Sequence, residues 1–163
     1  MSQFKFNYND GGRSEAGYKG KVGDCAVRAA AIATKIKYEE VYWTLADIAR
    51  NWKPESQSRR AKEIRSDPTP RNGVWREVLE QFLFDEMFVW ESLMGIGTGC
   101  QVNMNPESFA RQGASGIIVC RLSRHFSTVI DDVIHDTYDP SRGGTRCVYG
   151  WWRPVVDAPV FSR

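Results

Sequence analysis

The chain has 163 residues, of which 42% are hydrophobic and 26% are charged, and its formal net charge is +2. This length suits one domain with its own hydrophobic core and is short for two. A charge of +2 is too weak to indicate nucleic-acid or anionic-membrane binding. Residues 1–21 are polar and glycine-rich rather than signal-like, and no apolar stretch approaches the roughly 20 residues of a membrane span. We therefore expect a single cytoplasmic domain, residues 1–163, without membrane contact.

The first predicted helix begins at Cys25. Gly23 and Asp24 are residues that start helices, and the alanines that follow favour helix. A thiol at a helix start faces unpaired N–H groups and the positive end of the helix dipole, which favour the thiolate. The neighbouring Asp24 opposes this unless its carboxylate caps the helix. By position alone, Cys25 fits a reactive thiol and a small buried cysteine equally well.

The middle of the chain is predicted to form helices that support the fold rather than the site. Residues 38–52 and 74–84 carry apolar side chains at helical spacing. Between them, residues 53–72 are polar, basic and proline-terminated, which predicts a solvated, mobile loop with at most one short helix. A lid over a cleft, or a contact with acidic substrate or RNA, are the functional alternatives for this loop.

Five further segments follow in chain order. Residues 87–90 predict a short strand, and the glycines of residues 95–99 predict a turn, because no Gly-Lys-Ser/Thr follows to make a phosphate loop. Asn105 and Pro106 predict the start of a short helix that ends near Gln112. Residues 116–122 predict a buried strand. Residues 146–153 alternate weakly and include Trp151 and Trp152, which either shield a polar site or pack in the core.

Residues 123–140 predict a β-hairpin with Asp131 and Asp132 as its two-residue loop. In this register His125 and Asp136 share one face as diagonal neighbours, with Cβ atoms about 7 Å apart or less. His135 points to the opposite face, since side chains alternate along a strand. The predicted pairs are Ile130 with Val133, Thr128 with His135 and Phe126 with Thr137.

A histidine held by an aspartate is what a cysteine nucleophile needs. The carboxylate fixes the imidazole tautomer, and the free ring nitrogen accepts the thiol proton and later returns it to the leaving group. The alternative for His125 and Asp136 is a polar contact on a half-exposed hairpin. Together with Cys25 at a helix start, the pair predicts a catalytic triad.

The order Cys25, His125, Asp136, with the cysteine opening a helix and the other two on adjacent strands, resembles the papain-like cysteine peptidase superfamily. The sequence around these residues resembles the small bacterial and phage branches of the superfamily, the C39-like and NlpC-like groups, more than papain itself. The matching stretches, residues 23–33 and 123–140, cover under a fifth of the chain. The resemblance implies an α+β fold, with helices packed against a small antiparallel sheet.

The resemblance also implies a function: thiol-dependent hydrolysis of an amide in a peptide or protein substrate, through an acyl-enzyme intermediate. Neither a metal nor a cofactor is needed. One departure concerns the oxyanion. Such enzymes commonly carry a glutamine about six residues before the cysteine, where this chain has Lys19; the nearest upstream amides are Asn7 and Asn9. The Cys25 N–H supplies one donor, and the sequence names no second.

Three other functions compete with amide hydrolysis. The same triad serves transglutamination or glutamine deamidation. A papain-like interaction module without catalysis is favoured by the missing glutamine. A nucleic-acid binder would rest on the basic residues 50–71 alone, and these lack interleaved aromatic residues for base stacking. The sequence predicts neither the substrate's identity nor the oligomeric state.

The cysteines bear on the cellular compartment. The four thiols are too widely spaced for a C-x-x-C zinc site. In a cytoplasmic protein they are expected to be free, three of them structural, and a reducing compartment suits a working thiolate. They are Cys25, Cys100, Cys120 and Cys147.

Overall fold

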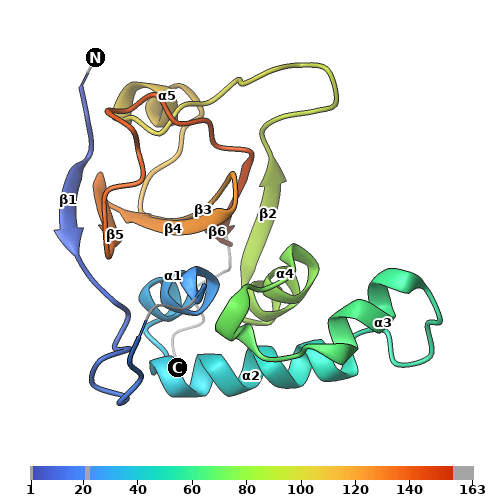
Figure 1. Cartoon of the computed structure of the whole chain (residues 1–163). Helices are drawn as coiled ribbons and strands as arrows, with labels where there is room; N and C mark the ends of the chain where they lie inside the picture. The colour runs from blue at the N-terminus through green and yellow to red at the C-terminus, as the bar shows by residue number, and fades with distance from the viewer. Residues whose placement is uncertain (1, 21–22, 156–163) are drawn as a thin grey trace, which may run out of the picture.

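The computed structural model describes residues 2–20 and 23–155 and has an α+β fold (Figure 1). The described residues form six strands, five α-helices and one short 3-10 helix. The strands are β1 (Lys5–Tyr8), β2 (Phe88–Ser92), β3 (Ile117–Leu122), β4 (His125–Ile130), β5 (Val133–Asp136) and β6 (Gly150–Pro154). The helices are α1 (Cys25–Thr34), α2 (Tyr38–Asn51), α3 (Arg59–Ser66), the 3-10 helix η1 (Pro70–Asn72), α4 (Arg76–Asp85) and α5 (Pro106–Arg111).

The six strands form one mixed sheet in the order β1-β5-β4-β3-β6-β2. Neighbouring strands are antiparallel, except that β1 runs parallel to β5. The expectation of a small antiparallel sheet is therefore wrong in this respect. Strand β1 was not predicted, because it has only four residues, all of them exposed, and a run this short gives a weak sequence signal.

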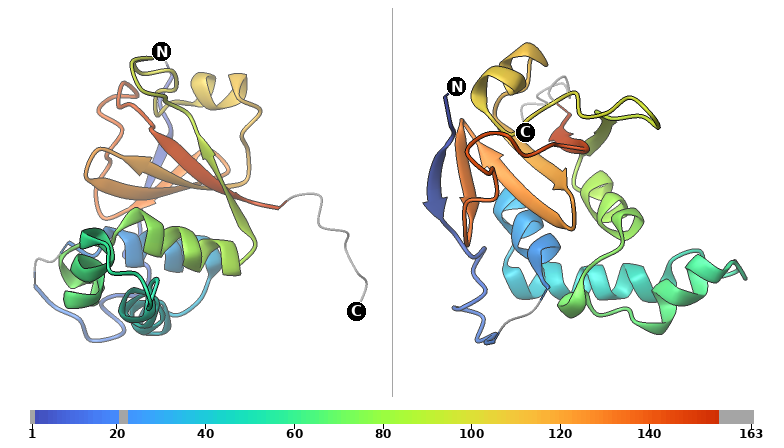
Figure 2. Two further views of the ribbon diagram at one scale, coloured as in Figure 1. Left: turned by 90° about the vertical axis from the view of Figure 1, so that its right-hand side faces the viewer. Right: turned by 45° about the horizontal axis from the view of Figure 1, so that its top comes forward.

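Helices cover both faces of the sheet. Figures 1 and 2 show α1 and α4 against one face, α2 beneath α1, and α5 on the opposite face. One hydrophobic cluster joins α1, α2 and α4 to Val119 and Trp152 of the sheet. A second cluster packs Phe109 of α5 against side chains that include Val129 and Trp151. The chain thus has two apolar layers that share one sheet.

Helix α1 is the central helix, and its alanines explain how closely it packs. Ala26, Ala29, Ala30, Ala31 and Ala33 are all buried. Small side chains let a helix backbone approach a sheet, and here the Thr128 hydroxyl of β4 donates a hydrogen bond to the Ala29 carbonyl at 2.8 Å. This contact fixes the first turns of α1 against the strand that begins with His125.

Besides α1, three predicted helices are present: α2, α4, and the short α5, whose start is capped by Asn105 accepting from the Ser108 N–H at 2.8 Å. The segment 53–72 is more ordered than the expected loop, because it contains α3 and η1. Buried Ala61 and Ile64 hold α3 to the rest of the protein, and Arg65 donates hydrogen bonds to three backbone carbonyls. The one short helix that the sequence permitted within residues 53–72 is therefore confirmed as α3.

The β4–β5 hairpin has the predicted register. Thr128 lies opposite His135, and Ile130 lies opposite Val133. Asp131 and Asp132 have φ angles of 49° and 65°, and two positive φ values are what a type I′ turn requires. Because β5 ends at Asp136, the third expected pair, Phe126 with Thr137, lies beyond the ladder.

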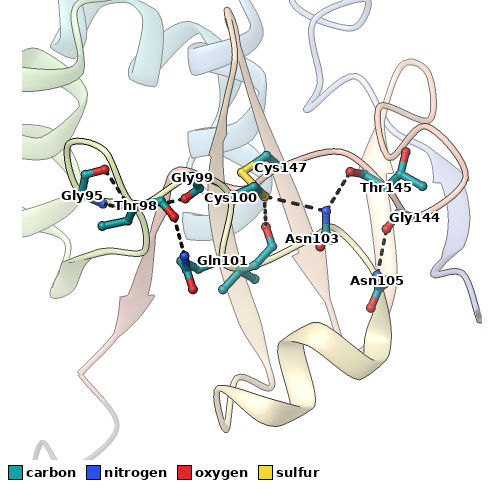
Figure 3. Close-up of a disulfide and its surroundings, with 11 residues drawn as sticks. Gly95, Thr98, Gly99, Cys100, Gln101, Asn103, Asn105, Gly144, Thr145 and Cys147 are labelled. Atoms are coloured by element: carbon teal, nitrogen blue, oxygen red, sulfur yellow. Dashed lines mark hydrogen bonds between the residues drawn. A yellow bond between two sulfur atoms is a disulfide. The ribbon is translucent and has the colours of Figure 1, made fainter.

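Cys100 and Cys147 form a disulfide, with Cα atoms 5.8 Å apart (Figure 3). Around it, the side-chain amides of Asn103 and Asn105 donate to the Thr145 and Gly144 carbonyls at 2.8 Å each. The disulfide therefore ties the loop after β2 to the segment that leads into β6. The expectation of four free thiols is wrong; Cys25 and Cys120 are the free cysteines of the described residues.

Removing this disulfide should destabilise the fold. It closes a loop of 47 residues, and a loop of that size predicts that Cys100→Ser with Cys147→Ser lowers the free energy of unfolding by roughly 2–4 kcal/mol. Urea denaturation measures the change. A phosphine reductant should lower wild-type stability by a similar amount and leave the double variant unchanged. Four free thiols in the denatured, unreduced protein would contradict the pairing.

Within the described ranges, no helix is both long and apolar enough to cross a bilayer.

Candidate active site

Cys25 and His125 line one cleft of about 690 Å³. One wall is the β3–β4 hairpin, which contributes residues 121–126. The other wall comes from α3, η1 and the start of α4. The cleft thus lies where the sheet meets the helices, and Cys25 lines it as the first residue of α1.

The helix start at Cys25 is confirmed. Cys25 is partly exposed, so its thiol is accessible from the cleft. The first N–H groups of a helix have no partner inside the helix, and they carry the positive end of its dipole. The thiol therefore sits beside backbone groups that favour a negative charge.

His125 and Asp136 are hydrogen-bonded as the register predicted. His125 Nε2 donates to Asp136 Oδ2 at 2.7 Å, and both side chains are buried, at 7% and 4% exposure. The Ser127 hydroxyl donates to the same oxygen at 2.6 Å, and the Thr137 N–H donates to Oδ1 at 2.7 Å. Although burial raises the pKa of Asp136, the hydrogen bonds from His125 and Ser127 outweigh it and hold that pKa below its usual value.

The imidazole of His125 links the carboxylate to the thiol. Nε2 is occupied by Asp136, and the Cys25 side chain acts electrostatically on the same ring, so Nδ1 is the ring nitrogen left free to exchange a proton with the thiol. Burial alone lowers the pKa of His125, but the hydrogen bonds with Asp136 and Cys25 raise it to about 9. At neutral pH this imidazole is therefore stable as an imidazolium, which suits a thiolate partner.

The negative charge of Asp24 is offset by ion pairs, and not by capping the N-terminus of α1. Asp24 is at the N-cap of α1 and makes no side-chain cap hydrogen bond. Instead its oxygens form ion pairs with Arg13, at 3.1 Å, and with Arg28, and accept from the Tyr38 hydroxyl at 2.6 Å. Two guanidinium groups offset its charge, so the anion next to Cys25 opposes the thiolate less than an unpaired carboxylate would.

Arg28 also reaches the triad. Its Nη2 lies 3.8 Å from Asp136 Oδ1, so one guanidinium lies between the carboxylate beside Cys25 and the carboxylate that holds His125. Arg28 is not among the site residues predicted from the sequence. Its spacing of four residues from Asp24 and three from Cys25 is a signal that could have found it, because residues at these separations are neighbours on a helix surface.

Tyr138, and not the tryptophans, packs beside His125. The two ring centroids are 5.1 Å apart. If the β4–β5 register is continued past its last pair, Tyr138 lies opposite His125 and Ser127 lies opposite Asp136. Trp151 and Trp152 are completely buried, against Phe109 and Trp90. The expected alternative, that these tryptophans pack in the core, is confirmed.

The upstream amides lie away from the cleft. Asn7 and Asn9 both contact Nδ1 of His135 at 3.3 Å, and burial lowers the pKa of this second histidine. Lys19 is exposed. The side-chain amide among the residues that line the described cleft is that of Asn72. Its backbone lies close to Gly23, where a Cβ would come 3.3 Å from the Asn72 carbonyl carbon.

Comparison of this chain with models of protein families, with curated protein sequences and with solved structures found no match. The interpretation of the site therefore rests on its geometry and chemistry.

Proposed function

We propose that the protein is a papain-like thiol hydrolase that cleaves an amide bond in a peptide or protein, with Cys25 as nucleophile, His125 as base and acid, and Asp136 as the residue that orients His125. The observation that supports this most is the buried hydrogen bond from His125 to Asp136 in a cleft that Cys25 and His125 line together. Three groups of the types and order needed for acyl transfer meet at one point.

In the proposed reaction, the proton of the Cys25 thiol already resides on Nδ1 of His125 at neutral pH, and the thiolate attacks the carbonyl carbon of the scissile amide. The resulting tetrahedral intermediate collapses as the imidazolium returns the proton to the leaving amine, and a thioester to Cys25 remains. Water, deprotonated by His125, then attacks the thioester carbonyl, which releases the carboxylic acid and restores the Cys25 thiolate beside the His125 imidazolium. Asp136 keeps Nε2 protonated throughout and stabilises the imidazolium.

The oxyanion needs donors beside the sulfur. The backbone N–H of Cys25 supplies one. For the second we assign the side-chain amide of Asn72, because it lines the cleft and its backbone packs against Gly23, two residues before the nucleophile. This amide takes the place of the upstream glutamine that the chain lacks. Transglutamination and deamidation use the same thioester and differ in the acyl donor and acceptor.

The disulfide bears on the cellular compartment in which the proposed enzyme works. Cys100–Cys147 would persist in an oxidising environment, whereas the cytoplasm keeps most thiols reduced. A cytoplasmic location, expected from the polar residues 1–21, therefore holds only if this pair is reduced in the cell. The nucleophile of the proposed reaction is separate from the pair, because Cys25 is a free thiol.

Cys25 should be the first thiol to react with iodoacetamide near neutral pH. Cys100 and Cys147 are paired, and burial raises the pKa of Cys120, which is completely buried. Mass spectrometry of the native protein should show one fast alkylation, located at Cys25 and absent from Cys25→Ser. The matched control, Cys120→Ser, should keep the fast phase. Fast labelling of any other cysteine would remove the basis for the proposed nucleophile.

Turnover is tested with peptide and ubiquitin-like acyl substrates, with Cys25→Ala as the blank. Release of an amine that requires Cys25 supports the hydrolase. A stable Cys25 thioester that forms and is discharged only by added amines would favour the transglutaminase. An unreactive Cys25 together with no turnover would favour the interaction module.

A further inference from the structure

Two arginines stand out among the charged residues that line the cleft. The glutamate and one arginine of the lining are paired: Glu63 with Arg59 at 2.8 Å, and Arg76 with Glu80 at 2.8 Å. Arg121 and Arg124 make no ion pair or side-chain hydrogen bond within the described residues. Both are on the hairpin wall that carries His125, so two unpaired positive charges lie beside the triad.

The backbone of this wall is held in place. The Tyr149 N–H donates to the Arg121 carbonyl at 2.9 Å, and Arg146 donates to the Ser123 carbonyl at 2.5 Å in the turn that holds Arg124. Arg124 has a φ of 57°, in the left-handed region that L-residues rarely adopt. The two guanidinium groups therefore extend from a fixed hairpin, which is an arrangement that suits a ligand better than a mobile loop does.

Arg121 is also in an electrostatically unfavourable place. Its side chain is partly buried, and it is repelled by the nearby Arg76. Burial is the larger cause and Arg76 the smaller cause of a lowered pKa of Arg121, and the negative charge of Glu77 offsets part of this decrease. A guanidinium next to a like charge gains from a bound anion, because charge-assisted hydrogen bonds then replace the repulsion. The opposite wall of the cleft carries the carboxylate of Asp67, which repels an anion. A bound anion is therefore favoured only at the hairpin wall, beside the two arginines.

We propose that Arg121 and Arg124 bind a carboxylate of the substrate, so that the enzyme prefers acidic peptides over neutral peptides of the same shape. This rests on the proposed function for the cleavage step, but the binding of the carboxylate does not require cleavage. The carboxylate comes either from an acidic side chain near the scissile bond or from the C-terminus of the substrate. Both sources present the planar pair of oxygens that a guanidinium binds with two hydrogen bonds.

The first test uses two alkylating reagents of nearly equal size, iodoacetate and iodoacetamide, on native protein at fixed ionic strength. The ratio of their rates at Cys25 reports the charge of the cleft. Removing one guanidinium, in Arg121→Gln or Arg124→Gln, should lower the iodoacetate rate relative to the iodoacetamide rate by roughly 3-fold, the size of a screened interaction between unit charges several ångströms apart. Arg142→Gln, which removes an exposed arginine outside the cleft lining, should leave the ratio unchanged.

The second test is independent of thiol chemistry. Peptide pools of equal length are titrated against Cys25→Ala: one carries Glu, one carries Gln at the same position, both with amidated ends, and a third carries Gln with a free C-terminal carboxylate. We expect the Glu pool or the free-carboxylate pool to bind at least roughly 5-fold more tightly than the neutral pool, the value of a charge-assisted pair in a solvated cleft. Which of the two pools binds identifies the source of the carboxylate.

The preference should disappear in Cys25→Ala combined with Arg121→Gln or Arg124→Gln, and thermal melts show whether each variant is folded. Arg124 is exposed in a turn, so its variant remains informative if the Arg121 variant does not fold. Equal binding of the three pools, or a preference that survives in the folded arginine variants, would overturn the proposal. Acidic-peptide binding without turnover would support it while the hydrolase proposal fails.

Discussion

At about pH 6, His125→Ala should react with iodoacetamide roughly 10-fold more slowly than the wild type, and at about pH 9 the two rates should converge. The reason is the raised pKa of His125, about 9, which keeps the ring charged beside Cys25 at about pH 6 and leaves it about half charged at about pH 9. Without the imidazolium, thiolate forms only as an unassisted thiol ionises, near pH ~8.5. The full effect on thiolate population is larger, but a stabilised thiolate is also a weaker nucleophile, which reduces the difference in rate.

The matched control is His135→Ala. His135 lies against Asn7 and Asn9, away from the cleft, so its removal should leave the alkylation profile of Cys25 unchanged. A pH–rate profile of each variant, followed by mass spectrometry, distinguishes the two histidines. Equal effects of the two substitutions, or a larger effect of His135→Ala, would show that the imidazole of His125 does not act on the thiol.

The part of the site that could be predicted from sequence is the part set by local periodicity. Alternation along the strands and a two-residue loop fix the register, and the register alone brings His125 and Asp136 together. The start of α1 is likewise local, since Gly23 and Asp24 precede an alanine-rich run. These signals need no knowledge of the tertiary structure.

The parts that could not be predicted depend on contacts between distant segments. Strand β1 is exposed and short, and it is defined by its pairing with β5; there the Asn9 N–H donates to the Asp136 carbonyl at 2.8 Å. The Cys100–Cys147 disulfide joins residues 47 apart, and spacing alone does not choose among the possible pairs of four cysteines. The second wall of the cleft comes from α3 and η1, whose polar sequence gives little evidence of packing.

The structure sharpens what is expected of Asp136, because each of its oxygens has a different task. Oδ2 accepts from His125 and Ser127, and Oδ1 accepts from the Thr137 N–H and lies near Arg28. An asparagine has one oxygen and one NH₂ group. If its oxygen faces His125, its NH₂ faces the Thr137 N–H and the guanidinium, so donors meet donors in a buried site.

Asp136→Asn should therefore lower stability as well as activity. We expect the free energy of unfolding to fall by roughly 1–3 kcal/mol, the cost of a buried donor left without an acceptor. Urea denaturation measures it. Asp132→Asn, in the exposed hairpin turn where a positive φ tolerates asparagine, is the matched control and should change stability little.

The effect of these variants on Cys25 separates an orienting role for Asp136 from a purely structural one. Asp136→Asn still holds the ring through its oxygen but stabilises an imidazolium less, so turnover and alkylation at about pH 6 should fall partially, well short of the roughly 10⁴-fold loss known for the equivalent change in a serine protease. Asp136→Ala orients nothing and should cost more than Asp136→Asn in both measurements. If Asp136→Ala is folded and alkylates Cys25 at the wild-type rate across this pH range, Asp136 does not act through His125, and its hydrogen bonds serve the fold alone.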